Sequence, residues 1–106
     1  MMARTSLQKQ QSYADFLVSK LQCFRATNTN GLGCLVFIAY HTKETSRLTV
    51  GFEIGDGTSW LYELQYAIDE SVSRTEAARA CRNELEQVFD DPVSNGAIET
   101  TEKTDV

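Results

Sequence analysis

A helix-capping sequence divides the chain into two parts of different character. Ser73-Arg74-Thr75-Glu76 places a serine three residues before a glutamate. The serine hydroxyl can accept a hydrogen bond from the glutamate amide, and the glutamate carboxylate can reach back to the serine amide. Strand-like alternation precedes this capping box and helical spacing follows it. The box therefore predicts a boundary where a sheet ends and an amphipathic helix begins.

The residues after the capping box repeat with helical spacing. On a wheel of about 100° per residue, their apolar side chains fall within about 120°. Pro92 follows Asp90 and Asp91 and cannot continue a helix, so it marks the end. The predicted buried positions are Ala77, Ala78, Cys81, Leu85, Val88 and Phe89.

A second amphipathic helix is predicted near the N-terminus, over residues 13–25. Ser12 caps it, with Asp15 at the third helical position. Residues 1–11 are polar and glutamine-rich without an apolar period, which predicts a flexible arm. The apolar stripe consists of Tyr13, Phe16, Leu17, Leu21 and Phe24.

Three segments between the helices have the periods of β-strands. Residues 34–40 form a continuous apolar run, which indicates a strand that needs cover on both faces. Residues 48–54 alternate between apolar and other side chains, as a half-buried strand does. Residues 60–68 also alternate and are predicted as a third strand. A helix is the alternative for this segment, since helical spacing aligns Leu61, Leu64 and Ile68.

The order of these elements predicts an α+β fold in two layers. A helix, a three-stranded antiparallel meander and a second helix occupy residues 12–91. The length of 106 residues suits one domain. Residues 92–106 contain mainly serine, threonine, asparagine and acidic side chains, which predicts an acidic disordered tail.

The composition limits where in the cell the protein is expected and whether disulfide, metal or cofactor sites are expected. No apolar run approaches the roughly 20 residues that span a bilayer, and the polar first residues lack a signal-peptide core. We therefore expect no membrane association and a cytoplasmic location. The three cysteines show no metal-ligand spacing, so neither a disulfide framework nor a metal site is predicted, and no cofactor motif is present.

Candidate catalytic groups are few. His41 is the only histidine, and no nucleophile motif accompanies it. Asp69 and Glu70 form an acidic pair that can bind a cation or divide acid and base roles, and Glu53 and Glu63 are candidates for a cross-strand pair. Such groups are more often solvated surface charges, so we expect a non-enzymatic protein, with an enzyme that uses His41, Asp69 or Glu70 as a remote alternative.

Basic side chains gather on the second predicted helix. Arg74, Arg79 and Arg82 occupy an arc of about 140° at 100° per residue. They can face an anion near the helix N-terminus or form ordinary surface pairs with neighbouring glutamates. The net charge is −5, and residues 90–106 carry −4 of it. A strongly electropositive surface is not predicted.

The element order and the start of the second helix resemble the double-stranded RNA-binding domain. Ser73 to Cys81 is similar to the family stretch in which a serine precedes basic and small residues, although Thr75 and Ala78 stand where the family places lysines. The resemblance implies an RNA-binding surface with weakened phosphate contacts. Its residues would be Ser73, Arg74, Arg79 and Arg82.

The sheet itself points to a protein partner. If both helices cover one face, the apolar first strand leaves either Leu35 and Phe37 or Val36 and Ile38 on the other face, joined by Leu61 and Ala67. A contiguous exposed apolar patch on a small domain usually marks an interface. We therefore expect a protein-interaction or adaptor module that forms a homodimer through this face. A degenerate double-stranded RNA-binding domain is the alternative.

Overall fold

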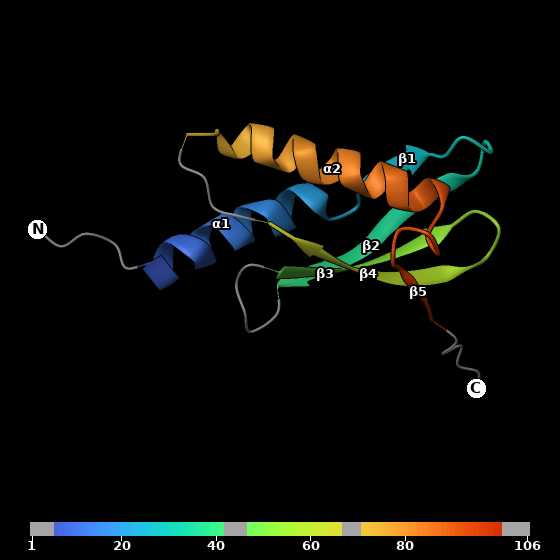
Figure 1. Cartoon of the computed structure of the whole chain (residues 1–106), viewed down its shortest axis with the longest axis horizontal. Helices are drawn as coiled ribbons and strands as arrows, with labels where there is room; N and C mark the ends of the chain where they lie inside the picture. The colour runs from blue at the N-terminus through green and yellow to red at the C-terminus, as the bar shows by residue number, and fades with distance from the viewer. Residues whose placement is uncertain (1–5, 42–46, 67–70, 101–106) are drawn as a thin grey trace, which may run out of the picture.

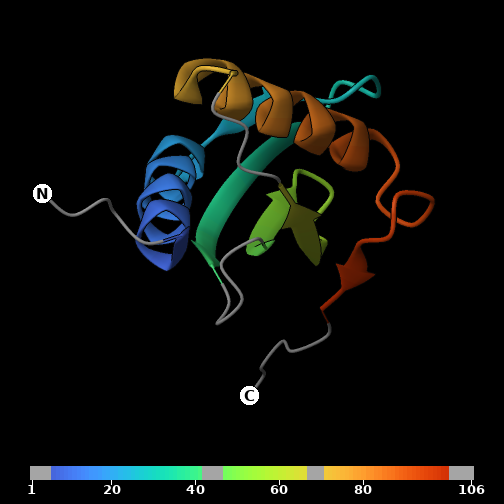
Figure 2. The ribbon, with the colours of Figure 1, turned by 60° about the vertical axis from the view of Figure 1, so that its left-hand side comes forward.

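A computed structural model describes residues 6–41, 47–66 and 71–100 of the chain, with side chains from residue 11 onward. Two helices lie on one side of a five-stranded antiparallel sheet whose strand order is β1-β2-β3-β4-β5 (Figures 1 and 2). The elements are α1 (Ser6–Leu21), β1 (Arg25–Thr27), β2 (Gly33–His41), β3 (Arg47–Ile54), β4 (Ser59–Gln65), α2 (Arg74–Asp90) and β5 (Ile98–Glu99).

The predicted two-layer α+β architecture is confirmed. The central meander β2-β3-β4 pairs as expected, with Phe52 opposite Val36 on one side and Trp60 on the other. The strand interpretation of the third segment is correct, because β4 runs from Ser59 to Gln65. None of the helices in the described residues is long and apolar enough to cross a membrane.

The core lies between the helices and the sheet. Every second residue of β3 points into it, because side chains alternate between the two faces of a strand. The ring of Phe52 packs against that of Phe89 from α2, with centroids 4.9 Å apart. The largest fully buried side chains are Phe52, Phe89, Leu17, Leu21, Leu48, Leu64, Leu85, Val36, Val50 and Val88.

The predicted cap of α2 is present. The Ser73 side chain accepts a hydrogen bond of 3.1 Å from the Glu76 amide, and Ser73 itself has extended backbone angles. The helix ends at Asp90, two residues before Pro92. All five buried positions of α2 belong to the set predicted from sequence.

Helix α1 is displaced from its predicted bounds. It begins at Ser6, so residues 6–11 are helical instead of a flexible arm, while residues 1–5 lie outside the described residues. The glutamines and the lysine of this segment are good helix formers. The helix ends earlier than predicted because Cys23 adopts a positive φ of 63°, and the chain then enters β1.

The acidic segment after α2 also differs from its prediction, since residues 92–100 are ordered. The Ala97 amide donates to the Pro92 carbonyl, and the next residues form β5. Ile98 pairs with Leu61, and the Thr100 amide donates to the Ser59 carbonyl. The predicted disordered tail is therefore wrong for this stretch. Residues 101–106 lie outside the described residues.

Candidate protein interface on the outer sheet face

A β-bulge in β2 places two consecutive apolar side chains on the face opposite the helices, which we call the outer face. The pairing steps from Val36 with Phe52 to Ile38 with Gly51, so Phe37 is an extra residue. A bulge of this kind interrupts the strict alternation of side chains. Phe37 and Ile38 are consequently 49% and 40% exposed, while the flanking Val36 and Ala39 are buried in the core.

The register aligns these residues with two further apolar side chains. Ile38 lies opposite Gly51, Gly51 opposite Leu61, and Leu61 opposite Ile98. Directly paired residues point to the same face. An apolar row therefore crosses β2, β3, β4 and β5, with Leu61 39% and Ile98 70% exposed. We call Phe37, Ile38, Leu61 and Ile98 the apolar row.

Gly51 lets the row pack closely over the sheet. A Cβ atom at this position would lie 2.6 Å from Cγ2 of Ile38 and 3.1 Å from Cζ of Phe37. Both side chains therefore lean over the bare backbone of β3, and Gly51 is buried beneath them. Because they already have partners in the same molecule, Phe37 and Ile38 lose less freedom when a second surface covers them.

Polar side chains surround the apolar row. Toward one end of the strands, Tyr40 lies opposite Thr49, and Thr49 opposite Glu63. Glu63 in turn forms an ion pair of 3.6 Å with Arg47. An apolar centre with a polar rim is the usual anatomy of a protein interface.

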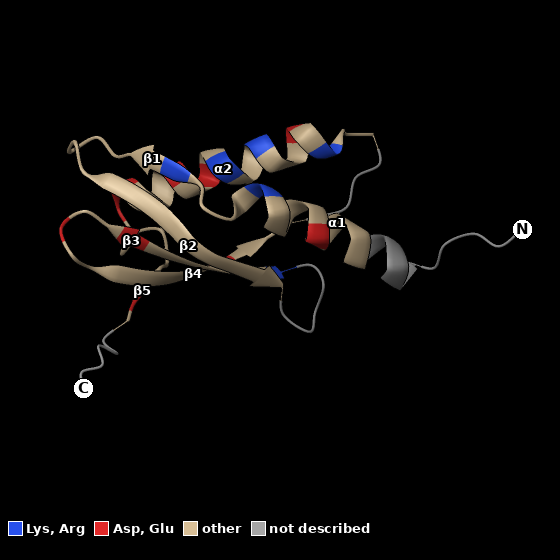
Figure 3. Cartoon of the chain, turned by 180° about the vertical axis from the view of Figure 1, so that it is seen from behind, with Lys and Arg blue, Asp and Glu red and all other residues tan. Residues whose placement is uncertain are grey.

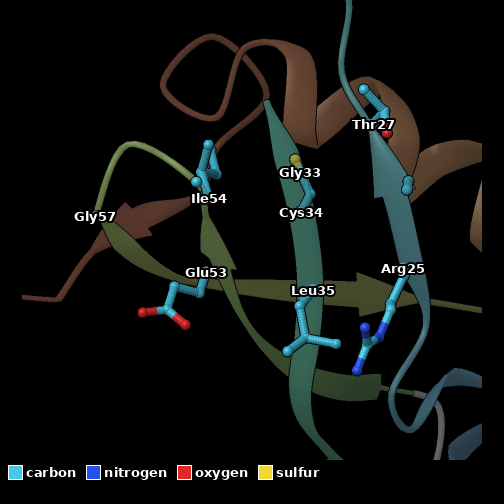
Figure 4. Close-up of a pocket in the computed structure, with 10 residues that line it drawn as sticks. Arg25, Thr27, Gly33, Cys34, Leu35, Glu53, Ile54 and Gly57 are labelled. Carbon is cyan, nitrogen blue, oxygen red and sulfur yellow. The ribbon is translucent and has the colours of Figure 1, made fainter. Parts of the chain in front are cut away.

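A shallow cavity of about 540 Å³ lies near the other end of the outer face (Figure 4). Arg25 and Glu53 stand on either side of Leu35, each from a different strand. This part of the rim thus offers one positive and one negative group to a bound surface.

The predicted interface residues are only partly brought together. The two alternatives of the sequence interpretation were both incomplete, because the bulge exposes Phe37 and Ile38 at once. Val36 is wrong as an interface residue, since it is fully buried. Leu35 is half-buried on the outer face, and Ala67 lies outside the described residues.

The candidate RNA-binding residues lie on the helix layer (Figure 3). The guanidinium of Arg74 lies 5.9 Å from the ring centroids of Tyr13 and Phe16 and donates a 3.1 Å hydrogen bond to Ser12. The Arg82 guanidinium lies 4.7 Å from the Phe24 ring. Arg79 is exposed, and Ser73 serves as the α2 cap. These cations are therefore separate from the apolar row.

Among the described residues, the candidate catalytic groups His41, Glu53 and Glu63 do not assemble into a site. Nε2 of His41 lies 3.3 Å from Oδ1 of Asp15 and 2.8 Å from Nε2 of Gln11, so the histidine links β2 to α1. Asp69 and Glu70 lie outside the described residues. Glu53 and Glu63 both occupy the outer face but lie four residue pairs apart along β3 and β4, opposite Leu35 and Thr49 respectively. Within the described ranges no group of three metal-ligating side chains gathers.

Two side chains on the helix side, Cys81 and Tyr62, are protonated at neutral pH. Burial raises the pKa of the Cys81 thiol to about 11, with a smaller contribution from Glu84. A thiol with such a pKa is a poor nucleophile, because the thiolate is the reactive form. Burial, assisted by a hydrogen bond to Glu84, likewise raises the pKa of Tyr62 to about 12.

Comparison with known proteins provides no relative: no family model, no curated protein and no solved structure matches this chain.

The sequence interpretation missed three residues of the outer face. Tyr40 is 48% exposed beside the row, Gly51 lies beneath it, and Ile98 extends it to β5. The one signal for Ile98 was an isolated large apolar residue in a polar segment.

Proposed function

We propose that this chain is a non-enzymatic protein-interaction module that binds a second copy of itself through the outer sheet face. The observation that carries the proposal is the apolar row, which crosses four strands without an intervening charged residue. Four large side chains exposed by 39% to 70% lie side by side there. Such a patch on a small domain is costly in water and gains free energy when it is covered.

The arrangement suits association of identical surfaces. A twofold interface must be self-complementary, because the same patch is presented by both copies. The apolar row has no net charge to repel its copy, and the rim contains both signs, in Arg25 and Arg47 and in Glu53 and Glu63. The three free cysteines support a cytoplasmic setting, where thiols stay reduced.

The test is the mass of the chain in solution measured by light scattering over a range of concentrations. We expect about twice the mass of one chain for the natural protein, in accord with a twofold pair. Leu61→Lys places a charge in the middle of the row and should give a single chain. Val93→Lys is the matched control, since Val93 is 71% exposed outside the sheet. A single chain at every concentration would refute self-association.

Binding of duplex RNA is a second candidate, supported by the cations of the helix layer. Lys20 and Arg74 both lie over the Phe16 ring, from α1 and α2 respectively. Ala78, which stands at a lysine position of the family, is buried against the sheet and offers no site for a phosphate contact. Each missing contact removes counterion release, so we expect weak RNA binding that is lost as salt rises.

A gel-shift assay with duplex RNA at low and physiological salt separates the two candidates. Replacing both Arg74 and Arg79 by alanine should leave self-association unchanged. Tight binding at physiological salt that this double substitution abolishes would favour the RNA function over the protein interface.

A further inference from the structure

The outer backbone groups of β2 and of β4 differ in how far the rest of the chain covers them. Strand β1 pairs with only the first three residues of β2, so the rest of that edge needs other partners. The Val36 amide donates to the Phe24 carbonyl, and the Ala39 amide donates to the Gln22 side chain at 3.1 Å. The chain therefore provides partners from its own groups for these two amides of the edge.

The edge at β4 is only half covered. Strand β5 pairs with Trp60 and Leu61, and its last contact joins the Thr100 amide to the Ser59 carbonyl. Figure 1 shows β5 beside one end of β4. On the side away from β3, the remainder of β4, from Tyr62 to Gln65, has no strand beside it among the described residues.

The direction of the free backbone groups follows from alternation along the strand. The Ile54 amide donates to the Thr58 carbonyl, so residues 58, 60, 62 and 64 direct their backbone groups toward β3. The Thr100 bond shows that Ser59 directs its groups to the opposite side. Glu63 and Gln65 share the orientation of Ser59. Their N–H and C=O groups thus face outward at the open half of the edge.

A groove lies beside this open half. It encloses about 300 Å³ and is lined by the end of β4 and Tyr66 after it, by Val72, by α2 and by one side chain of α1. Small residues of α2, Ala77 and Ala80, leave the space. Gln65 and Tyr66 both line it although they point to opposite faces of the strand, which places the groove at the edge of β4. Its lining is Tyr13, Gln65, Tyr66, Val72, Ala77, Ala80, Cys81 and Glu84.

We propose that this edge and groove bind an extended, positively charged peptide segment of a partner protein, which adds a strand beside Glu63 and Gln65. Main-chain hydrogen bonds would supply affinity, and alternate side chains would supply specificity. An apolar side chain fits between Ala77 and Ala80. The preference for positive charge follows from Glu84, the one charged residue of the lining, whose carboxylate accepts a hydrogen bond from the neutral Tyr62 hydroxyl and so keeps its negative charge.

The experiment uses the full chain and an end-blocked synthetic peptide in which lysine alternates with valine. We expect binding by calorimetry, together with slower amide hydrogen exchange at Glu63 and Gln65. The same peptide N-methylated at alternate residues should lose about fivefold or more in affinity, since each lost hydrogen bond is worth about 1 kcal/mol. Equal affinity of the N-methylated peptide, or exchange that does not change at β4, would overturn the proposal.

Two variants locate the site. Gln65→Pro removes an outward N–H without removing a bond to β3, and Ala80→Trp fills the groove, so each should weaken peptide binding by about fivefold or more. Asn83→Trp is the matched control, because Asn83 is exposed on α2 outside the groove lining. Circular dichroism verifies that each variant is folded.

This proposal and the self-association proposal fail separately. Leu61→Lys alters the outer face and should leave peptide binding intact. Gln65→Pro should leave the mass of the protein in solution, measured by light scattering, unchanged. The mass in solution could instead be doubled for the natural chain and for Leu61→Lys but not for Gln65→Pro. That result would place a second copy at the β4 edge and would overturn the peptide as its occupant.

Discussion

Tyr62 joins the sheet to α2 through a single side-chain hydrogen bond. Its hydroxyl donates to a carboxylate oxygen of Glu84, 22 residues later in the chain. Burial of the phenol, with the adjacent carboxylate, favours the protonated form and raises the pKa of Tyr62 to about 12. Folding is therefore coupled to the protonation of this side chain.

The expected consequence is a loss of stability in alkali. The pKa of Tyr62 is about 10 in the unfolded chain and about 12 in the folded one. Its stabilising contribution is thus complete below pH 10 and disappears as the pH rises toward 12. Urea unfolding at several pH values measures this slope, which Tyr62→Phe should reduce. A slope equal to that of the natural chain would contradict the coupling.

Single residues also show where sequence reasoning reaches its limit. The alternation of Leu48, Val50 and Phe52 correctly predicted which side of β3 is buried, because polar or small residues stand between them. The run around Phe37 and Ile38 has no polar residue to mark its faces, so the bulge between them left no signal in the pattern. Phe37, Ile38 and Leu61 were therefore named from sequence, but the exposure of Phe37 and Ile38 together was not predicted.

At the scale of elements, local chemistry determined what was predictable. Helix α2 begins and ends at strong local signals, a capping serine and a proline, and its predicted bounds agree with the structure. Helix α1 ends at Leu21, two residues before Cys23, whose positive φ has no sequence signal because cysteine does not favour that conformation. Strand β5 has two residues, too few for any periodicity, and its existence depends on pairing with β4.

The cap of α2 leads to a prediction at this scale. Ser73→Ala removes the acceptor for the Glu76 amide and should lower the free energy of unfolding by about 1 kcal/mol. Ser73→Asp keeps an acceptor at the same place and should restore the stability. Urea unfolding of the three chains measures the difference. Equal destabilisation by alanine and aspartate would show that the hydroxyl acts in another way.

At the scale of the whole molecule, three surfaces are separated by the layers of the fold. The cations of α1 and α2 lie on the helix side, the apolar row lies on the opposite face, and the open edge of β4 lies between them. Phe37 and Leu61 can therefore be changed without altering Arg74 or Glu84. This separation is what allows each proposed interaction to be tested by its own substitution.

The contribution of β5 to the whole can be measured by shortening the chain. A chain that ends at Asp91 lacks Ala97, which is buried, and the two residues that pair with Trp60 and Leu61. We expect a lower free energy of unfolding and a red shift in the fluorescence of Trp60, the only tryptophan. A chain that ends at Thr100 should match the full chain in both. Unchanged fluorescence after truncation at Asp91 would show that β5 does not shield this side chain.

The pairing of β5 with β4 has a consequence for biosynthesis. A ribosome makes the chain from its N-terminus at about 5–20 residues per second, so β5 is the last of the five strands to leave it. Until β5 pairs with Trp60 and Leu61, that part of the β4 edge has no strand on its outer side. The nascent chain thus passes through a brief stage in which it is most exposed to wrong pairing and to chaperones.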